Sequence, residues 1–380
     1  MNLAIAVIRP FHATLMANSL QNRGNIVQIL TSAPRTYFKG LNPAVGIRVI
    51  PAPVQILKRT LPFQLPESAE RHGLALWDRM VAAALPPADA VIGFATQALT
   101  TGRRARSRGT RFLLDRACPH VDFQQNIVRS EAEHIGARYR PQPPWFRERQ
   151  LEEYALADSI LVPSHYTAAS FPPELRHKLV LAPLLGRELS QHTVPPARDA
   201  VFTVGVLGGN PLRKGYLYLL QAWKQMAIPN ARLLIRNQSD FANYPLLQEL
   251  LQQLPNVEFA GYVDNISSFY SRCDVFCLPS VDDGFGMALS EAMAYGLPCV
   301  ATDHCGASEL MTAGVDGLVV PARDPDALAQ ALLSLYRDPA LRESIGHAGR
   351  QTIARIEQQA LYENALIHAV TGNEATLRPE

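Results

Sequence analysis

Short apolar runs alternate with amphipathic stretches along the chain. The run LAIAVI (3–8) is followed by a helical pattern over about 13–22, an Arg-Gly stop and a second apolar run, IVQILT (26–31). A strand, a helix and a strand in this order are typical of a parallel βαβ unit with a right-handed crossover. The other strands expected in this half are ADAVIGF (88–94), RFLLD (111–115), SILVPS (159–164) and KLVLAP (178–183).

The alternation restarts after a polar, Pro-bearing stretch at about 186–198, which has the composition of a linker. The elements expected there are strands at 202–208, 231–236, 257–262, 274–280, 298–303 and 316–321, and helices at about 215–226, 246–254, 287–294, 325–336 and 339–369. This pattern predicts an α/β fold with two doubly wound domains, 1–190 and 191–350, that face a central cleft. Residues 351–380 are expected to form a helix that packs back on the first domain, and a tail.

Composition favours a globular protein: 47% of the 380 residues are hydrophobic and 18% are charged. The first apolar run lacks a preceding basic residue and is too short for a signal peptide, and no run is long enough to cross a bilayer. We therefore expect a cytoplasmic protein. The five cysteines are scattered without a C-x-x-C pair and are expected to be reduced, with Cys273 and Cys277 on one face of a buried strand.

The two halves differ in charge. Residues 1–190 carry 23 Lys and Arg against 14 Asp and Glu, whereas residues 191–380 carry 13 against 20. The basic stretch GRRARSRGTR (102–111) is consistent with cations at a helix C-terminus, and also with an anionic membrane surface or a lipid diphosphate acceptor. No recognition helix or aromatic stacking motif accompanies it, so nucleic acid is not an expected partner.

The segment VDDGFGMALSEAMAYGLPCVATD (281–303) carries the most informative chemistry. A strand ends before a turn that contains Asp283 and two glycines, and a helix begins near Met287. Free backbone N–H groups at such a helix start suit a phosphate. Asp283 and Glu291 are expected to face one cleft. The alternative is that Asp283 caps the helix and Glu291 lies on a solvated face.

A second loop, LGGNPLRKGYLYLLQAW (207–223), places Arg213 and Lys214 beside glycines after a strand. An Arg fork and a Lys point charge suit a diphosphate. An exposed basic pair on a loop is the alternative. No site for a metal is expected.

The segment DGFGMALSE (283–291) resembles the signature of the retaining nucleotide-sugar glycosyltransferases of family four, the glycosyl transferases group 1, which have the two-domain GT-B fold. The runs 259–280 and 296–320 are similar to neighbouring family blocks, and EEYALADSILVPS (152–164) gives local support in the first half. This chain has Asp283 where the family usually has Glu, and Gly208 or Gly209 where the family has the Arg of its phosphate loop.

The resemblance implies a role for each matching residue. Glu291 would hold the ribose hydroxyls, Asp283 would contact the donor sugar, and Lys214 would bind the pyrophosphate, helped by Arg213. The backbone of Gly284, Phe285, Gly286 and Met287 would bind sugar and diphosphate. His120, just beyond a strand end in LLDRACPH, would lie near the sugar and its β-phosphate, or else be structural. Arg9 or His12 would touch the acceptor.

We therefore expect a retaining glycosyltransferase that uses a nucleoside diphosphate sugar as donor and no further cofactor. Its acceptor would be a saccharide or a lipid-linked saccharide in bacterial surface polysaccharide, lipopolysaccharide or glycolipid assembly, at the inner face of the membrane. A sugar-nucleotide-binding scaffold without turnover is the alternative. A Rossmann oxidoreductase is disfavoured because no G-x-G-x-x-G follows the first strand.

Overall fold

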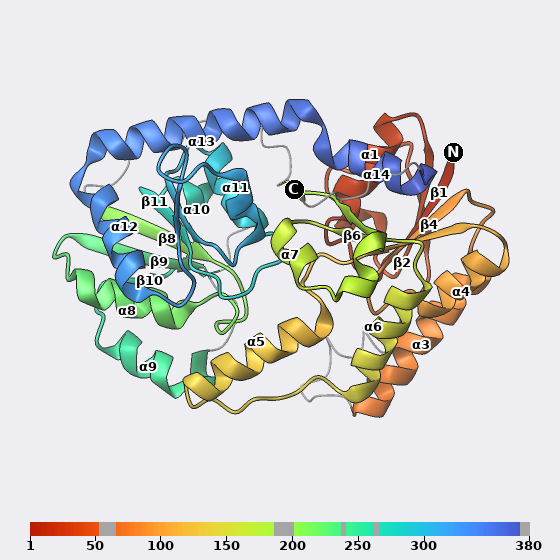
Figure 1. Cartoon of the computed structure of the whole chain (residues 1–380), viewed down its shortest axis with the longest axis horizontal. Helices are drawn as coiled ribbons and strands as arrows, with labels where there is room; N and C mark the ends of the chain where they lie inside the picture. The colour runs from red at the N-terminus through yellow and green to blue at the C-terminus, as the bar shows by residue number, and fades with distance from the viewer. Residues whose placement is uncertain (53–65, 186–200, 237–240, 262–265, 373–380) are drawn as a thin grey trace.

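Two parallel sheets, each covered by helices, make up the protein (Figure 1). The computed structural model describes residues 1–52, 66–185, 201–236, 241–261 and 266–372. The expected linker and the polar tail from 373 lie outside the described residues, so the domain boundaries stay predictions.

The N-terminal domain is built on a seven-stranded sheet in the order β3-β2-β1-β4-β5-β6-β7. All of its strand pairs are parallel. Its strands are β1 (Asn2–Ala6), β2 (Ile26–Thr31), β3 (Gly46–Val49), β4 (Ala90–Phe94), β5 (Arg111–Asp115), β6 (Ser159–Val162) and β7 (Leu179–Leu181). Strand β4, in the middle of the sheet, is apolar throughout because helices cover both faces of the sheet.

The helices of this domain connect the parallel strands. They are α1 (Ala13–Asn22), η1 (Arg35–Tyr37), α3 (Glu67–Ala84), α4 (Leu99–Ser107), α5 (Val121–His134), α6 (Pro144–Leu156), α7 (His165–Ala169) and η2 (Pro173–Lys178). The strand order reverses between β1 and β4, and a doubly wound sheet binds ligands at that switch point.

The C-terminal domain repeats this plan with a six-stranded parallel sheet in the order β10-β9-β8-β11-β12-β13. Its strands are β8 (Phe202–Leu207), β9 (Ala231–Arg236), β10 (Val257–Phe259), β11 (Val275–Leu278), β12 (Cys299–Thr302) and β13 (Leu318–Val320). Here the order reverses between β8 and β11. The two doubly wound domains confirm the fold class expected from the sequence.

The helices of the C-terminal half are α8 (Tyr216–Met226), η4 (Phe241–Asn243), α9 (Pro245–Gln252), α10 (Ser267–Tyr270), α11 (Met287–Ala294), η5 (Gly306–Leu310), α12 (Pro325–Arg337), α13 (Pro339–Gln359) and α14 (Leu361–Thr371). Figure 1 shows α13 extending from this domain toward the N-terminal one, where α14 lies against α1. In that packing Ser19 donates to Glu363 at 3.1 Å, and Arg111 donates to the carbonyl of Ala369 at 2.7 Å.

The single helix expected over about 339–369 is wrong. Ala360 lies between α13 and α14 in the left-handed region, with φ 48° and ψ 39°. No Gly or Pro marks this break in the sequence. The break lets α13 pack against α11 while α14 packs against α1, so tertiary packing overrides the local helical preference.

The cysteines are all free, and four of the five are buried. The expectation that Cys273 and Cys277 share one strand face is wrong, because Cys273 precedes β11 and packs in a different hydrophobic cluster from Cys277. Their burial is nevertheless confirmed. Burial raises the pKa of the Cys277 thiol above its ordinary range, so this residue is a packing group and not a nucleophile.

Candidate active site

The two motif loops meet at the switch point of the C-terminal sheet. The loop from Gly208 to Gly215 follows β8, and the loop from Pro279 to Gly286 follows β11. Because β8 and β11 are adjacent and parallel, both loops emerge at the same edge of the sheet. The sequence therefore predicted two halves of one site, and the topology places them together.

Glycine is required at both ends of the first loop. Gly208 has φ 142°, and a Cβ atom there would lie 2.8 Å from Cε of Lys214. Gly215 has φ 63°, and its Cβ atom would lie 1.9 Å from the carbonyl oxygen of Pro279. Because of these close approaches, Lys214 lies against the loop after β11. Gly209, between Gly208 and the turn, is exposed.

The two basic residues of the first loop pair with the two aspartates of the second. Lys214 Nζ contacts the Asp283 carboxylate, and Arg213 Nε donates to Asp282 Oδ2 at 2.7 Å. The Lys214 and Arg213 side chains are only 19% and 23% exposed. The alternative of an exposed basic pair is therefore wrong, and four charges lie together at this edge of the sheet.

Asp283 does not cap the following helix. The N-cap of α11 is Gly286, with φ 85°, and no side-chain hydrogen bond caps it. The Asp283 backbone is instead held by the loop after β12, because its N–H donates to the carbonyl of His304 at 3.0 Å. The Phe285 side chain packs in the hydrophobic core, and its carbonyl accepts from the Ala307 N–H. The start of α11, at Met287, thus keeps its backbone N–H groups at the site.

Glu291 lies in the second turn of α11 and is half-buried. Its Oε2 accepts a hydrogen bond from the Tyr270 hydroxyl at 2.9 Å. Burial, together with the charge of Glu291, raises the pKa of Tyr270 well above its ordinary value, so the hydroxyl remains a donor. This hydrogen bond orients the carboxylate, and the alternative of a freely solvated residue is wrong.

The N-terminal domain packs directly against the second loop. The carbonyl oxygen of Gly284 accepts from Ser164 Oγ at 2.6 Å and from Thr167 Oγ1 at 2.9 Å. A Cβ atom on Gly284 would lie 2.1 Å from the carbonyl oxygen of Ala117. The loops after β5 and β6 therefore face the loop after β11, and the carboxyl ends of both sheets meet.

His120 is placed by its own domain. Its Nδ1 accepts from the backbone N–H of Asp122 at 3.3 Å, which caps α5, and its ring packs between Tyr154 and Phe171. Burial lowers the pKa of His120, so the ring is neutral near pH 7. These contacts support the structural alternative for His120. Among the described residues His120 makes no direct contact with Asp283 or Lys214, and its role beside the donor stays a prediction.

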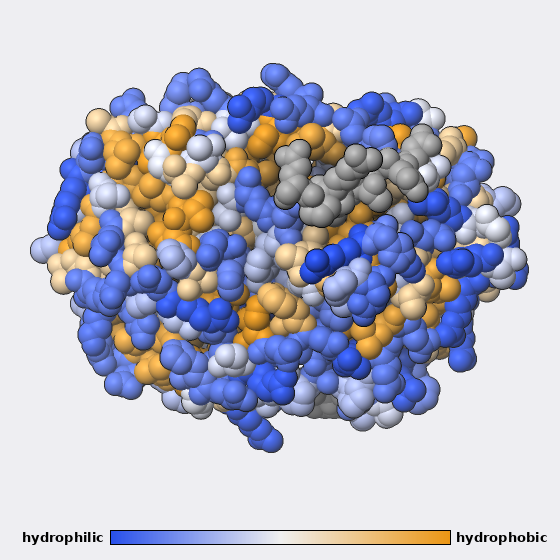
Figure 2. All heavy atoms as spheres, viewed as in Figure 1, coloured by the Kyte–Doolittle hydropathy of each residue, from blue (hydrophilic) through white to orange (hydrophobic). Residues whose placement is uncertain are grey.

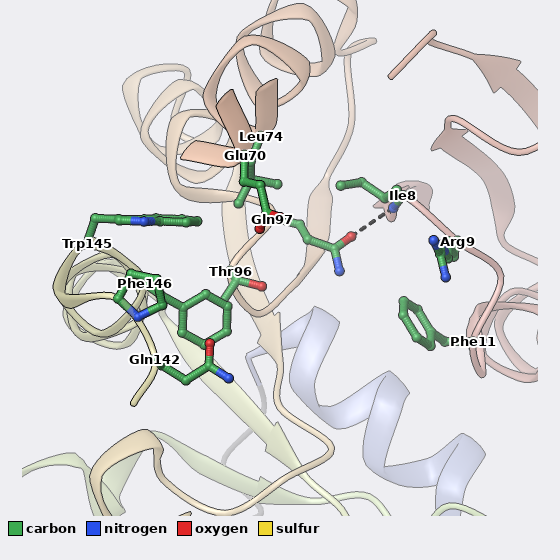
Figure 3. A pocket seen from close by; sticks show the side chains of 11 residues that line it. Ile8, Arg9, Phe11, Glu70, Leu74, Thr96, Gln97, Gln142, Trp145 and Phe146 are labelled. Carbon is green, nitrogen blue, oxygen red and sulfur yellow. Dashed lines mark hydrogen bonds between the residues drawn. The ribbon is translucent and has the colours of Figure 1, made fainter. Parts of the chain in front are cut away.

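A cavity of about 430 Å³ opens at the switch point of the N-terminal sheet (Figure 3). Arg9 and Ile8, after β1, line it together with Thr96 and Gln97, after β4. Figure 3 shows Trp145 and Phe146 on the side opposite Arg9. His12 is not in its lining; His12 Nε2 pairs with Asp115 Oδ2 at 2.7 Å in the interior.

The basic stretch is partly neutralised by the fold. Arg103 and Arg106 of α4 pair with Glu152 and Asp158, and Arg108 donates to the carbonyl of Leu85 at 2.9 Å. Arg111 donates a hydrogen bond to α14, as described above. The edge of the molecule where α3 and α4 lie is hydrophilic (Figure 2). No helix of the described residues is long and apolar enough to span a bilayer.

Three features of the site were missed from the sequence. Asp282 is completely buried at the domain interface, Ser164 donates to the carbonyl of Gly284 in the loop after β11, and His12 pairs with Asp115. The only local signal was the Asp282-Asp283 dipeptide, because the other partners lie far away in the chain. In the described ranges, no three His, Cys, Asp or Glu side chains form a cluster that could hold a metal ion.

The model of the family described as glycosyl transferases group 1 matches residues 198–338, which include both motif loops. Residues 198–338 therefore belong to the group 1 glycosyltransferase family. A capsular polysaccharide biosynthesis glycosyltransferase, CapM of Staphylococcus aureus, is 32% identical over 171 residues, or 43% of this chain. The alignment spans 44% of that relative, so the chain covers less than half of CapM's own length.

Solved structures match over nearly the whole chain. A sucrose-phosphate synthase from Thermosynechococcus elongatus gives a TM-score of 0.73 at 20% identity, covering 98% of this chain and 100% of that one. HepE of Anabaena, in complex with UDP-glucose, gives a TM-score of 0.65 at 15% identity, covering 98% of both chains. At these identities the likeness concerns the fold. The chain has the GT-B fold expected from its motif.

Proposed function

We propose that this protein transfers a sugar from a nucleoside diphosphate donor to an acceptor hydroxyl, with retention of anomeric configuration. The observation that carries the proposal is the contact between Lys214 and Asp283 beside the start of α11, at the switch point of the C-terminal sheet. A cation, an acidic group and free backbone N–H groups at that point suit a diphosphate joined to a sugar.

Each part of the donor has a partner. The diphosphate binds Lys214, Arg213 and the backbone from Gly284 to Met287, where the helix dipole favours negative charge. The sugar hydroxyls bind Asp283. The ribose diol binds Glu291, because an oriented carboxylate can accept from two hydroxyls.

The chemistry follows from these positions. The bond between the anomeric carbon and the β-phosphate oxygen breaks as the acceptor oxygen forms its bond on the same face of the sugar. The acceptor proton passes to the leaving phosphate. Lys214 and Arg213 stabilise the charge that develops on the diphosphate, which is electrostatic stabilisation by preorganised groups. The proposal includes no resident metal and no cofactor other than the donor.

The acceptor binds at the cavity of the N-terminal domain. This cavity lies at the second switch point, and the carboxyl ends of the two sheets face each other. Arg9, Gln97 and Trp145 offer a cation, an amide and an aromatic face. Such a lining suits a saccharide, whose hydroxyls need polar partners and whose ring faces are apolar.

Assembly of a bacterial surface polysaccharide or glycolipid is the process we propose. CapM, the relative with 32% identity, is named for capsular polysaccharide biosynthesis. We propose a saccharide or a lipid-linked saccharide as acceptor, and place the protein at the inner face of the membrane. The positive charge of residues 1–190 supports that position.

The experiment is donor screening with UDP-, GDP- and ADP-sugars, by thermal shift and by release of nucleoside diphosphate. A donor at 100-fold its dissociation constant adds about 2.7 kcal/mol to the free energy of unfolding. We expect one class of donor to stabilise the protein and to turn over. Stabilisation without release or transfer, in the presence of a lipid extract, would favour the binding scaffold. No stabilisation by any donor would contradict the site.

A further inference from the structure

The carboxylate of Asp282 joins the phosphate loop to the other domain. It is completely buried. Its Oδ2 accepts from Arg213 Nε at 2.7 Å and from Gln124 Nε2 at 3.1 Å. Its Oδ1 accepts from the Tyr166 hydroxyl at 3.2 Å. Arg213 belongs to the C-terminal domain, whereas Gln124 in α5 and Tyr166 in α7 belong to the N-terminal domain.

These bonds account for the burial of the carboxylate, because a charge in the interior is stable only when it is paired and hydrogen-bonded. Burial, followed by the charge of Asp282, raises the pKa of the Tyr166 phenol, so Tyr166 stays a donor at every pH of interest. Two of the three side-chain bonds that orient Asp282 therefore exist only while the two domains are in contact.

We propose that Asp282 is a positioning residue that couples binding of the donor diphosphate to contact between the domains. The inference rests on the proposed function. Arg213 uses Nε for Asp282, and its two terminal nitrogens carry four further N–H donors. A guanidinium held in this way presents a fork of donors beside Lys214, where the diphosphate is proposed to lie.

The coupling runs in both directions. Tyr166 and Gln124 orient Asp282, Asp282 orients Arg213, and Arg213 binds the diphosphate. A ligand that fixes Arg213 must therefore strengthen the interdomain bonds by the same factor by which those bonds strengthen its binding. The sugar donor is then held tightly only when the acceptor domain is in place.

A matched pair of variants tests this. Tyr166→Phe removes one hydroxyl that donates to Asp282 across the interface. Tyr218→Phe removes another hydroxyl that crosses the same interface, to Glu131 Oε2 at 2.9 Å, but Glu131 lies on α5 and not beside Arg213. Both variants lose one phenol-to-carboxylate hydrogen bond, and neither residue is proposed to touch the donor.

We expect Tyr166→Phe to raise the dissociation constant of UDP about tenfold, the size expected for one hydrogen bond to a charged group, and Tyr218→Phe to change it less than about twofold. Calorimetry measures both, with GDP and ADP used in turn if UDP does not bind. Equal effects of the two variants, or no effect of Tyr166→Phe, would overturn the inference while leaving the donor site intact. Failure of the wild-type protein to bind any of the three would remove the proposed function, and the inference with it.

Hydrogen exchange gives a second readout that loss of packing alone would not move. UDP should slow exchange in α7, residues 165–169, in the wild type and in Tyr218→Phe. That slowing should be lost in Tyr166→Phe at UDP concentrations that saturate the variant. Equal slowing in all three proteins would overturn the coupling, even if the affinities differ.

Discussion

Lys214 and Asp283 form an ion pair between the loop after β8 and the loop after β11. The two side chains come from positions 69 residues apart, and the parallel pairing of β8 with β11 brings them together. In a nucleoside diphosphate sugar, the β-phosphate is bonded directly to the sugar. A cation for the phosphate and an acid for the sugar must then be neighbours, as they are here.

Truncation should affect the two acids of the motif differently. Glu291→Ala removes a ribose contact that is the same in ground and transition state, so KM for the donor should rise with little change in kcat. Asp283→Ala disturbs the sugar as it becomes oxocarbenium-like, so kcat should fall by about 10²–10³. Steady-state kinetics with the donor found by screening measures both.

Asp283→Glu tests the shorter acid itself. A site adapted to Asp should lose activity when a methylene is added, whereas a site that keeps the family's usual geometry should gain it. If both alanine variants keep wild-type kinetics, the donor site is assigned to the wrong residues.

Transfer should survive chelation. In the proposed site the diphosphate is neutralised by Lys214, Arg213 and the start of α11, so we expect the reaction to need no metal ion. Activity is compared before and after EDTA, followed by addition of manganese. Loss of transfer in EDTA and its recovery with manganese would contradict this prediction, with Asp282 and Asp283 as the first ligands to examine.

Gly284→Ala should push the two domains apart where the loop after β11 meets the N-terminal domain. The added Cβ would lie 2.1 Å from the carbonyl oxygen of Ala117, and backbone on both sides leaves no flexible group to move. A displacement of about 1 Å at a reacting centre costs about 10²-fold, so transfer should fall at least that far. Gly46→Ala is the control, because its Cβ meets atoms only at 3.6 Å or more. Equal activities of the two variants would show that the close approach has no function.

Glu153 should make stability depend on pH. It is fully buried in α6 and accepts from the backbone N–H groups of Thr96 and Ala98. Burial raises its pKa from 4.5 to about 7. Between these values the folded state binds more protons than the unfolded state, so the contribution is full below pH 4.5 and is lost as the pH rises through 7.

Urea unfolding at pH 5, 6, 7 and 8 measures how the free energy of unfolding depends on pH. Its total change over the full range should reach about 3 kcal/mol. Glu153→Gln should flatten it and should also lower stability at pH 5 by about 1–3 kcal/mol, since an amide cannot accept both N–H bonds. Glu152→Gln, at the exposed neighbouring position, is the control and should keep the slope. A slope unchanged in Glu153→Gln would contradict the assignment.

The N-terminal half should bind anionic vesicles in a salt-sensitive way. Each basic residue near the surface contributes about 1 kcal/mol at low salt, and screening weakens this contribution. Since Arg103 and Arg106 of α4 already have acidic partners, we expect a weaker effect than their number implies. Sedimentation with neutral and anionic vesicles measures it, and equal sedimentation at low salt would exclude the membrane as a partner.

The sequence by itself determined the elements and the motif of this protein. Helix α1 and strands β2, β5 and β9 lie at the residues expected from hydrophobic spacing, because that spacing is a local property of the chain. The roles of the glycines around Lys214 and Asp283 could be predicted for the same reason, because a tight turn or a helix start requires particular residue types within a few positions.

Only the tertiary structure decided what those elements contact. In the sequence Asp282 is only the neighbour of Asp283. In the fold it is buried and accepts hydrogen bonds from Gln124 and Tyr166 of the other domain, which lie 158 and 116 residues away. Ala360 breaks a helix without any local signal, because α14 gains its contacts with α1 only in the folded chain. Such pairings depend on distances between remote segments, and no periodicity along a chain encodes them.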